Sequence, residues 1–226
     1  MGHGFVENLS FLWDCILELI YCGDEKCILC KSDLYNDRYI CKSCKNNIKI
    51  CKDSFKIGKG CHQFKCYSSS YYSGSMMELI IKLKYKSSFR SGNVIASYMK
   101  DTIHSNDISF DVLTYVPMTK KSFKKRGYNQ SEYLAKTLGK YFRKPVVSCL
   151  TKIKDTKDQI GLNEKERWNN IEGSFKVFDN HFINDKSVLL VDDVITTGAT
   201  VFYCSLELLK SGAKKVDILT GAKSRV

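Results

Sequence analysis

Residues 188–200 read VLLVDDVITTGAT, an apolar run that ends in two adjacent carboxylates and continues into a hydroxyl-rich turn containing Gly198. The apolar residues 187–191 predict a strand buried on both faces, as in a parallel sheet. The stretch over residues 199–212 predicts a helix that is stopped by Gly212, a residue suited to the C′ position. The stretch therefore predicts a strand–loop–helix unit whose loop lies at the carboxyl edge of an α/β sheet, where such sheets bind ligands.

The acid pair and the turn after it predict a binding site for a sugar phosphate. Buried carboxylates need partners, and vicinal ribose hydroxyls or a Mg²⁺ ion on a polyphosphate would serve Asp192 and Asp193. Backbone N–H groups at the start of a helix, together with flanking hydroxyls, hold a phosphate. We therefore expect a 5′-phosphate on the residues of the turn, which are Thr196, Thr197, Gly198, Ala199 and Thr200. The alternative, a capped helix without a ligand, explains one threonine but not the two aspartates.

The second half of the chain alternates predicted strands and helices. Residues 110–117, 146–150 and 215–219 predict strands, and residues 130–142 predict a helix with a regular apolar face. This alternation predicts an α/β fold with a mainly parallel sheet and right-handed crossovers. Residues 151–173 are polar and poorly periodic, so we expect a long loop there, which is either functional or an insertion without a role.

Nine of the 11 cysteines lie in the first 66 residues. Because we find no export signal, this predicts a metal-organised module rather than a disulfide framework. Two C-x2-C pairs, ten residues apart, supply four thiolates suited to a structural zinc site. Its ligands would be Cys27, Cys30, Cys41 and Cys44. A weaker set could form a second zinc site with His62 or Cys22, and its members are Cys51, Cys61 and Cys66.

The formal net charge of +12 over 226 residues favours a polyanionic partner, with a solvated lysine-rich surface as an equal alternative. Residues 1–22 predict an amphipathic helix packed on the protein, without the basic start and cleavage site of a signal peptide. No apolar stretch approaches the ~20 residues of a transmembrane helix. We therefore expect a cytoplasmic protein, with peripheral contact to the inner face of the membrane as an alternative. A change in composition divides the chain into residues 1–66, the helix and cysteine module, and residues 67–226, the α/β domain.

The 188–200 motif resembles the phosphoribosyl pyrophosphate (PRPP) loop of type I phosphoribosyltransferases. Three further segments and the cysteine module resemble one branch of that superfamily, the ComF family. These segments are IIKLKY (80–85), KKRGYNQ (124–130) and KIKDTKDQIGLNEKERWNNIEGSF (152–175). The resemblance covers about residues 9–223. It implies a parallel-sheet, type I phosphoribosyltransferase-like α/β domain with a small N-terminal zinc-binding module.

For the site, the resemblance implies that Asp192 and Asp193 hold the ribose hydroxyls of PRPP. Residues 196–200 would hold its 5′-phosphate, and Mg²⁺ would accompany the pyrophosphate. Arg126 would contact the pyrophosphate, since a guanidinium suits phosphate oxygens; a surface arginine is the alternative. Residues 152–173 would be a mobile cover over bound PRPP. Two lysines are weaker candidates for phosphate contacts, with solvated side chains as the alternative, and they are Lys84 and Lys154.

Thr196 narrows the choice of acceptor. The resemblance implies an aspartate base at this position in hypoxanthine-guanine enzymes, and a threonine cannot take that proton at neutral pH. We therefore expect no purine salvage of that kind, and no catalytic residue is assigned. The sequence leaves open whether the chain is an enzyme.

The ComF resemblance implies a role in DNA uptake during natural transformation. The partners would be PRPP, single-stranded DNA and proteins of the DNA-uptake machinery. One alternative is a phosphoribosyltransferase that acts on an unidentified small acceptor in nucleotide metabolism. Another is a binding protein that uses PRPP as a regulatory input.

Residues 42–72 interleave lysines with aromatic side chains, a composition suited to holding single-stranded nucleic acid. The aromatic members are Phe55, Phe64, Tyr67, Tyr71 and Tyr72. The alternative is a set of solvated lysines over a small aromatic core.

Overall fold

The computed structural model describes residues 26–34, 38–154 and 164–224. Helices are α2 (Lys42–Asn46), α3 (Gly74–Lys86), α4 (Phe89–Ser105), α5 (Lys120–Arg126), α6 (Gln130–Phe142), α7 (Glu164–Ile171) and α8 (Ala199–Lys210). Strands are β1 (Phe55–Lys59), β2 (His62–Tyr71), β3 (Val112–Tyr115), β4 (Leu150–Lys152), β5 (Phe175–Val177), β6 (Ser187–Ile195) and β7 (Lys215–Lys223). The helix expected over residues 1–22 and residues 155–163 of the expected cover lie outside the described residues.

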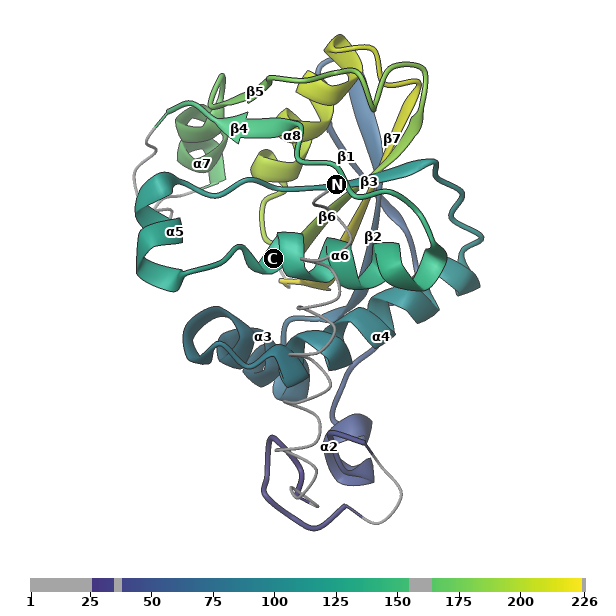
Figure 1. The fold of residues 1–226 in the computed structure, drawn as a ribbon, viewed down its shortest axis with the longest axis vertical. Helices are drawn as coiled ribbons and strands as arrows, with labels where there is room; N and C mark the ends of the chain where they lie inside the picture. The colour runs from purple at the N-terminus through teal and green to yellow at the C-terminus, as the bar shows by residue number, and fades with distance from the viewer. Residues whose placement is uncertain (1–25, 35–37, 155–163, 225–226) are drawn as a thin grey trace, which may run out of the picture.

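Five strands form the central sheet in the order β1-β2-β7-β6-β3. The four strands from β2 to β3 run parallel, and β1 pairs antiparallel with β2 at one edge. Figure 1 shows α3, α4 and α6 over one face of the sheet and α7 and α8 over the other. Each face has its own apolar core, because the sheet separates the two sets of helices. The predicted α/β class with a mainly parallel sheet is confirmed.

Several helix ends follow from local sequence. Thr119 and Asn129 precede α5 and α6 and accept backbone N–H groups of the first turn, as N-cap residues do. Gly127 and Gly212 have φ of +82° and +101° and follow α5 and α8, where a left-handed residue ends a helix at little cost for glycine. The helix predicted over residues 130–142 is α6 with the same bounds.

The strand predicted over residues 187–191 extends four residues further than expected, to Ile195. The reason lies in its neighbours. Strand β3 ends at Tyr115, opposite Val191, whereas β7 continues beside β6 to Lys223. The acid pair therefore belongs to the strand, one residue beyond the point where β3 stops, and still lies near the carboxyl edge of the sheet.

The prediction for residues 146–173 was wrong in two places. Strand β4 begins at Leu150 and pairs with β5 in a separate two-stranded sheet, while Val146 makes an isolated bridge to β3. The expected loop contains α7, eight residues long. Packing outweighs the polar composition there, because Ile171 is fully buried and the Trp168 ring lies 5.2 Å from the Phe202 ring of α8.

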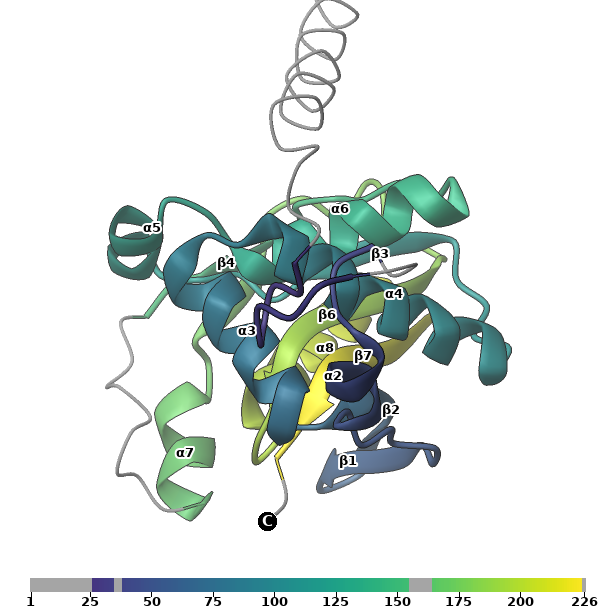
Figure 2. The same cartoon turned by 90° about the horizontal axis from the view of Figure 1, so that it is seen from below.

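The cysteine module lies at one end of the molecule, beyond α3 and α4 (Figures 1 and 2). Strand β2 crosses the expected division between residues 66 and 67 and pairs with β7 along the central sheet. Residues 55–66 consequently pack with the α/β domain, and the described parts of the module that lie outside the sheet are residues 26–34 and 38–48. Within the described ranges, no helix is both long and apolar enough to cross a bilayer.

Candidate functional site

The two aspartates of β6 are buried and have partners from two other parts of the chain. Asp192 and Asp193 are 9% and 3% exposed. The Asp192 Oδ1 atom accepts hydrogen bonds from the Ser131 hydroxyl at 2.8 Å and from the backbone N–H of Asp193 at 2.9 Å. The Lys84 ammonium lies 3.0 Å from Asp193 Oδ2. Helices α3 and α6 thus hold the acid pair from one face of the sheet.

The electrostatics of this cluster leave a surplus of negative charge. Burial, and then the charge of Asp193, raise the pKa of Asp192 to about 7, against the opposing effects of Ser131 and Lys84. Burial lowers the pKa of Lys84, but attraction to Asp193 and Asp192 outweighs it, so the net shift is upward and the ammonium stays charged. Above pH 7, two carboxylates face one ammonium. Hydroxyl groups that donate hydrogen bonds, or a divalent cation that prefers oxygen ligands, fit such a site.

A cavity of about 310 Å³ opens beside the pair. Its wall is formed by Asp192, by residues 194–201 and by Lys84. The first N–H groups of α8 lie in that wall, and such groups have no partner within their own helix. Gly198 supplies the turn at φ +84°, and an added Cβ would lie 3.0 Å from the Ile57 side chain. The expected loop residues 196–200 are therefore brought together with Asp192 around one cavity.

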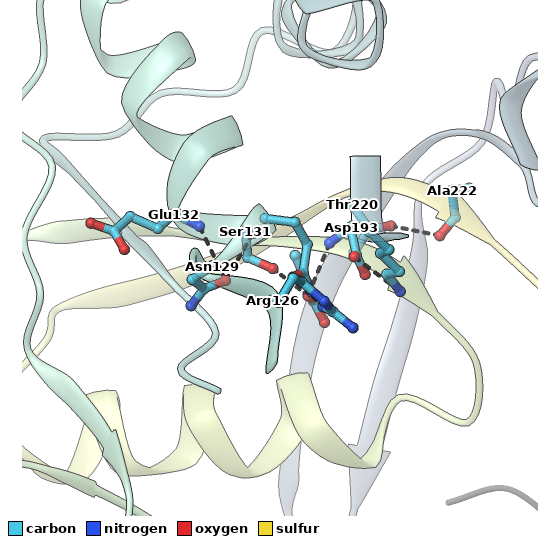
Figure 3. Close-up of polar contacts among 10 residues, drawn as sticks. Arg126, Asn129, Ser131, Glu132, Asp193, Thr220 and Ala222 are labelled. Atoms are coloured by element: carbon cyan, nitrogen blue, oxygen red, sulfur yellow. Dashed lines mark hydrogen bonds and ion pairs between the residues drawn. The ribbon is translucent and has the colours of Figure 1, made fainter. Parts of the chain in front are cut away.

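For Arg126, the expected contact with pyrophosphate stays a prediction. It is the last residue of α5, its guanidinium carbon lies 5.4 Å from the centre of the Tyr85 ring, and its Nη1 donates to Gln130 Oε1. The described residues that line the cavity do not include Arg126. Tyr85 follows Lys84 in α3, so Arg126 lies next to the cluster rather than within it; Figure 3 shows Arg126 with Ser131 and Asp193.

Sequence reasoning missed Asn129 and Ser131. The Asn129 side chain donates to the Val116 carbonyl at 3.0 Å and accepts from the Ser131 backbone N–H at 2.9 Å. It thereby joins the end of β3 to the start of α6 and positions the Ser131 hydroxyl on Asp192 (Figure 3). An Asn two residues before a Ser, at the start of a predicted helix, was a capping signal that could have found them.

The four expected zinc ligands converge in the described part of the module. Their sulfur atoms all lie within 4.8 Å of one another. The Cys27 and Cys44 sulfurs are 3.7 Å apart, and those of Cys30 and Cys41 are 3.5 Å apart. Four thiolates around Zn²⁺ at ~2.3 Å would be about 3.8 Å apart, so the residues present fit a tetrahedral ion. The cluster could hold such a metal.

Local hydrogen bonds prepare part of the cluster for ligation. The side chain and backbone of Ser32 lower the pKa of the Cys30 thiol to about 6, and the Ser32 side chain also lowers the pKa of Cys41. Burial and the neighbouring thiols raise the pKa of Cys44. A bound cation would reverse that last effect, because the thiolate is the form that binds metal.

The weaker cysteine set does not converge. Among the described residues, the group of side chains that could hold a metal ion is the four-cysteine cluster of Cys27, Cys30, Cys41 and Cys44. Cys61 lies in the exposed two-residue turn between β1 and β2, whereas Cys66 is fully buried in the sheet. Five residues of strand separate them by about 16 Å. The Cys61 thiol therefore lies in solvent and the Cys66 thiol in the interior of the protein, so the two do not share one metal site.

The aromatic residues of the 42–72 segment do not form one exposed surface. Phe64 and Tyr67 are buried, and the Phe64 ring packs edge-on against Phe202 at 5.5 Å. For these two side chains the alternative of an aromatic core is confirmed.

Comparison with known proteins identifies relatives in bacteria. Competence protein F of Haemophilus influenzae is 26% identical, with 85% of this chain and 94% of that protein covered. Competence protein ComFC of Streptococcus pneumoniae is 24% identical, with 88% of each chain covered. DNA utilization protein YhgH of Escherichia coli K12 is 29% identical over 48% of this chain and 47% of that protein, so the match spans about half of it. The resemblance to ComF proteins is confirmed at this level, and no protein-family model matches the chain.

Solved structures resemble the chain more distantly. Adenine phosphoribosyltransferase from Thermoanaerobacter pseudethanolicus is 12% identical with a TM-score of 0.41, covering 81% of this chain and 99% of that one. The glutamine PRPP amidotransferase from B. subtilis is 18% identical with a TM-score of 0.40, covering 57% of this chain and 25% of that one.

Proposed function

We propose that this chain binds Mg-PRPP at the cavity beside Asp192 and acts in the handling of single-stranded DNA during DNA uptake. The observation that carries the first part is the buried acid pair, held by Lys84 and Ser131, next to a cavity walled by residues 194–201. The names of the relatives, two competence proteins and a DNA utilization protein, support the second part.

In this proposal the ribose hydroxyls donate to Asp192 and Asp193. The donation would favour the charged form of Asp192, whose pKa is raised by burial and then by the charge of Asp193. The first turn of α8 would hold the 5′-phosphate through its backbone N–H groups and the partial positive charge of the helix start. Mg²⁺ would neutralise pyrophosphate oxygens. Lys84 would add a fixed ammonium, 22% exposed, on the same side.

Isothermal titration calorimetry with Mg-PRPP tests the site. We expect the Asp192→Asn/Asp193→Asn variant to lose at least tenfold in affinity, since each lost hydrogen bond to a charged group costs about 1.5–3 kcal/mol. Asp101→Asn is the matched control, because that carboxylate is 68% exposed. Equal affinity of wild type and the double variant would contradict the proposal.

A transferase activity has its own test. Release of pyrophosphate from Mg-PRPP on addition of nucleobases or other small acceptors would support a phosphoribosyltransferase of nucleotide metabolism. Binding of Mg-PRPP without release under any acceptor would support a binding role with PRPP as a regulatory input.

We also propose that the four-cysteine cluster holds a structural zinc ion. Four ligands fill a tetrahedral shell and leave no open position for a reacting water. Metal analysis of the purified chain should give one zinc per chain, and Cys44→Ser should lower this. Two zinc ions per chain would instead support the second set of Cys51, Cys61 and Cys66.

A further inference from the structure

A second cavity lies on the face of the sheet that α4 and α6 cover, opposite the face that α8 covers. It has a volume of about 640 Å³ and is enclosed by the cysteine module, α4 and α6. It shares none of its lining residues with the cavity beside Asp192. Six of its residues have side chains suited to nucleic acid, namely Arg38, Tyr39, Lys45, Tyr98, Lys100 and Tyr141. We call this cavity the tyrosine groove.

Two cations of the groove already lie on aromatic rings. The Lys100 ammonium is 4.9 Å from the centre of the Tyr141 ring, and the Arg38 guanidinium carbon is 5.3 Å from the centre of the Tyr39 ring. Tyr141 is 55% exposed. A ring this exposed beside a cation offers a nucleobase a stacking surface next to a phosphate contact.

The charge of the groove is positive. Arg38, Lys45 and Lys100 face one carboxylate, Asp101, which lies 3.7 Å from Lys100 and is 68% exposed at the rim. Three positive charges less one negative charge leave a net charge of +2. Burial raises the pKa of Tyr98, whereas Lys45 opposes the rise, so the Tyr98 ring stays neutral at physiological pH. Such a site attracts an anion while presenting flat neutral rings.

We infer that the tyrosine groove binds single-stranded nucleic acid, with unpaired bases stacked on Tyr141 and Tyr98 and phosphates near Arg38, Lys45 and Lys100. The volume falls within the ~300–1,000 Å³ of sites that take small organic groups. Stacking needs an open base face, which duplexes cover. The inference rests on the DNA part of the proposed function and assigns that binding to a place distinct from the PRPP cavity.

The groove is linked to the cysteine cluster. Tyr39 comes two residues before Cys41, and Lys45 directly follows Cys44. The backbone N–H of Ile28, in the first cysteine turn, donates to the Tyr39 carbonyl at 2.9 Å. One wall of the groove is therefore shaped by the turns that carry the thiols.

Fluorescence anisotropy with a labelled oligothymidylate of roughly 12 nucleotides tests the inference on the full chain. We expect Tyr141→Ala to weaken binding about tenfold, the loss typical of one stacked base. Lys100→Gln should reduce the slope of log affinity against log salt by about 0.7, one phosphate contact on a single strand. Phe178→Ala and Lys210→Gln are matched controls, because these exposed side chains belong to the α7–α8 side of the sheet.

Three outcomes would overturn the inference. One is unchanged affinity of Tyr141→Ala, and another is equal binding of an abasic strand, since stacking would then contribute nothing. The third is competition by thymidine monophosphate as effective as that by the strand, which would make the groove a mononucleotide site. Mg-PRPP calorimetry on the same variants separates the two sites, because groove variants should bind PRPP normally and Asp192→Asn/Asp193→Asn should bind the strand normally.

Discussion

Replacing Lys84 with methionine should destabilise the fold by about 3 kcal/mol at pH 8. The Lys84 ammonium lies 3.0 Å from Asp193, which is 4% exposed. At that distance and an effective dielectric constant of ~20 the gross attraction is about 5.5 kcal/mol. Removing one member of a buried ion pair costs about 3–5 kcal/mol, because the other charge stays buried without its partner. We expect the lower end, since Lys84 itself is 22% exposed.

The loss should depend on pH through Asp192. Its folded pKa of about 7 lies above the ordinary value of 3.8, so its contribution to stability is complete below pH 3.8 and is lost as the pH rises to about 7. Lys84 is one of the groups that lower this pKa, so in Lys84→Met the pKa should rise further. The variant should therefore be closer to wild type at pH 5.5 than at pH 8.

Urea denaturation followed by circular dichroism at the two pH values measures both effects. Lys136→Met is the matched control, because Lys136 pairs with Glu132 four residues earlier on α6, the two side chains are 63% and 28% exposed, and such a pair contributes less than about 1 kcal/mol. The double variant Lys84→Met/Asp193→Asn removes both charges and should recover most of the loss. A free energy of unfolding for Lys84→Met within about 0.5 kcal/mol of wild type at pH 8 would refute the reasoning.

Three further substitutions test other contacts. Asn129→Ala removes a helix cap and the donor to the Val116 carbonyl, so unfolding should become easier by about 2 kcal/mol in urea titrations, whereas Asn129→Asp should keep the cap and lose less. Gly198→Ala forces a side chain to φ +84°, and we expect about 1–2 kcal/mol of lost stability with weaker Mg-PRPP binding by calorimetry. Lys82→Met removes the 2.6 Å bond to the Ile28 carbonyl in the first cysteine turn, so a chelator should extract zinc faster than from wild type, as followed with a colorimetric indicator; unchanged release would contradict a link between α3 and the cluster.

Local sequence patterns were enough to predict several helix ends and the cysteine cluster. The bounds of α6 and the end of α8 followed from capping residues and apolar spacing, which act within a few residues. The cysteine spacing likewise placed four thiols that do converge. Where the prediction failed, a distant partner decided the outcome. Strand β6 is longer than expected because β7 continues beside it, and α7 forms because Trp168 packs on α8.

The sequence by itself determined the acid pair, the turn after it and the cysteine turns, because each is a short stretch whose chemistry depends on adjacent residues. Only the tertiary structure decided how these parts are held. Lys84 reaches Asp193, and Ser131 reaches Asp192, from helices far away in the sequence. The same packing placed Arg126 on the Tyr85 ring and enclosed the tyrosine groove between the module, α4 and α6. Such contacts depend on how helices dock on the sheet, and no local pattern in the chain encodes that docking.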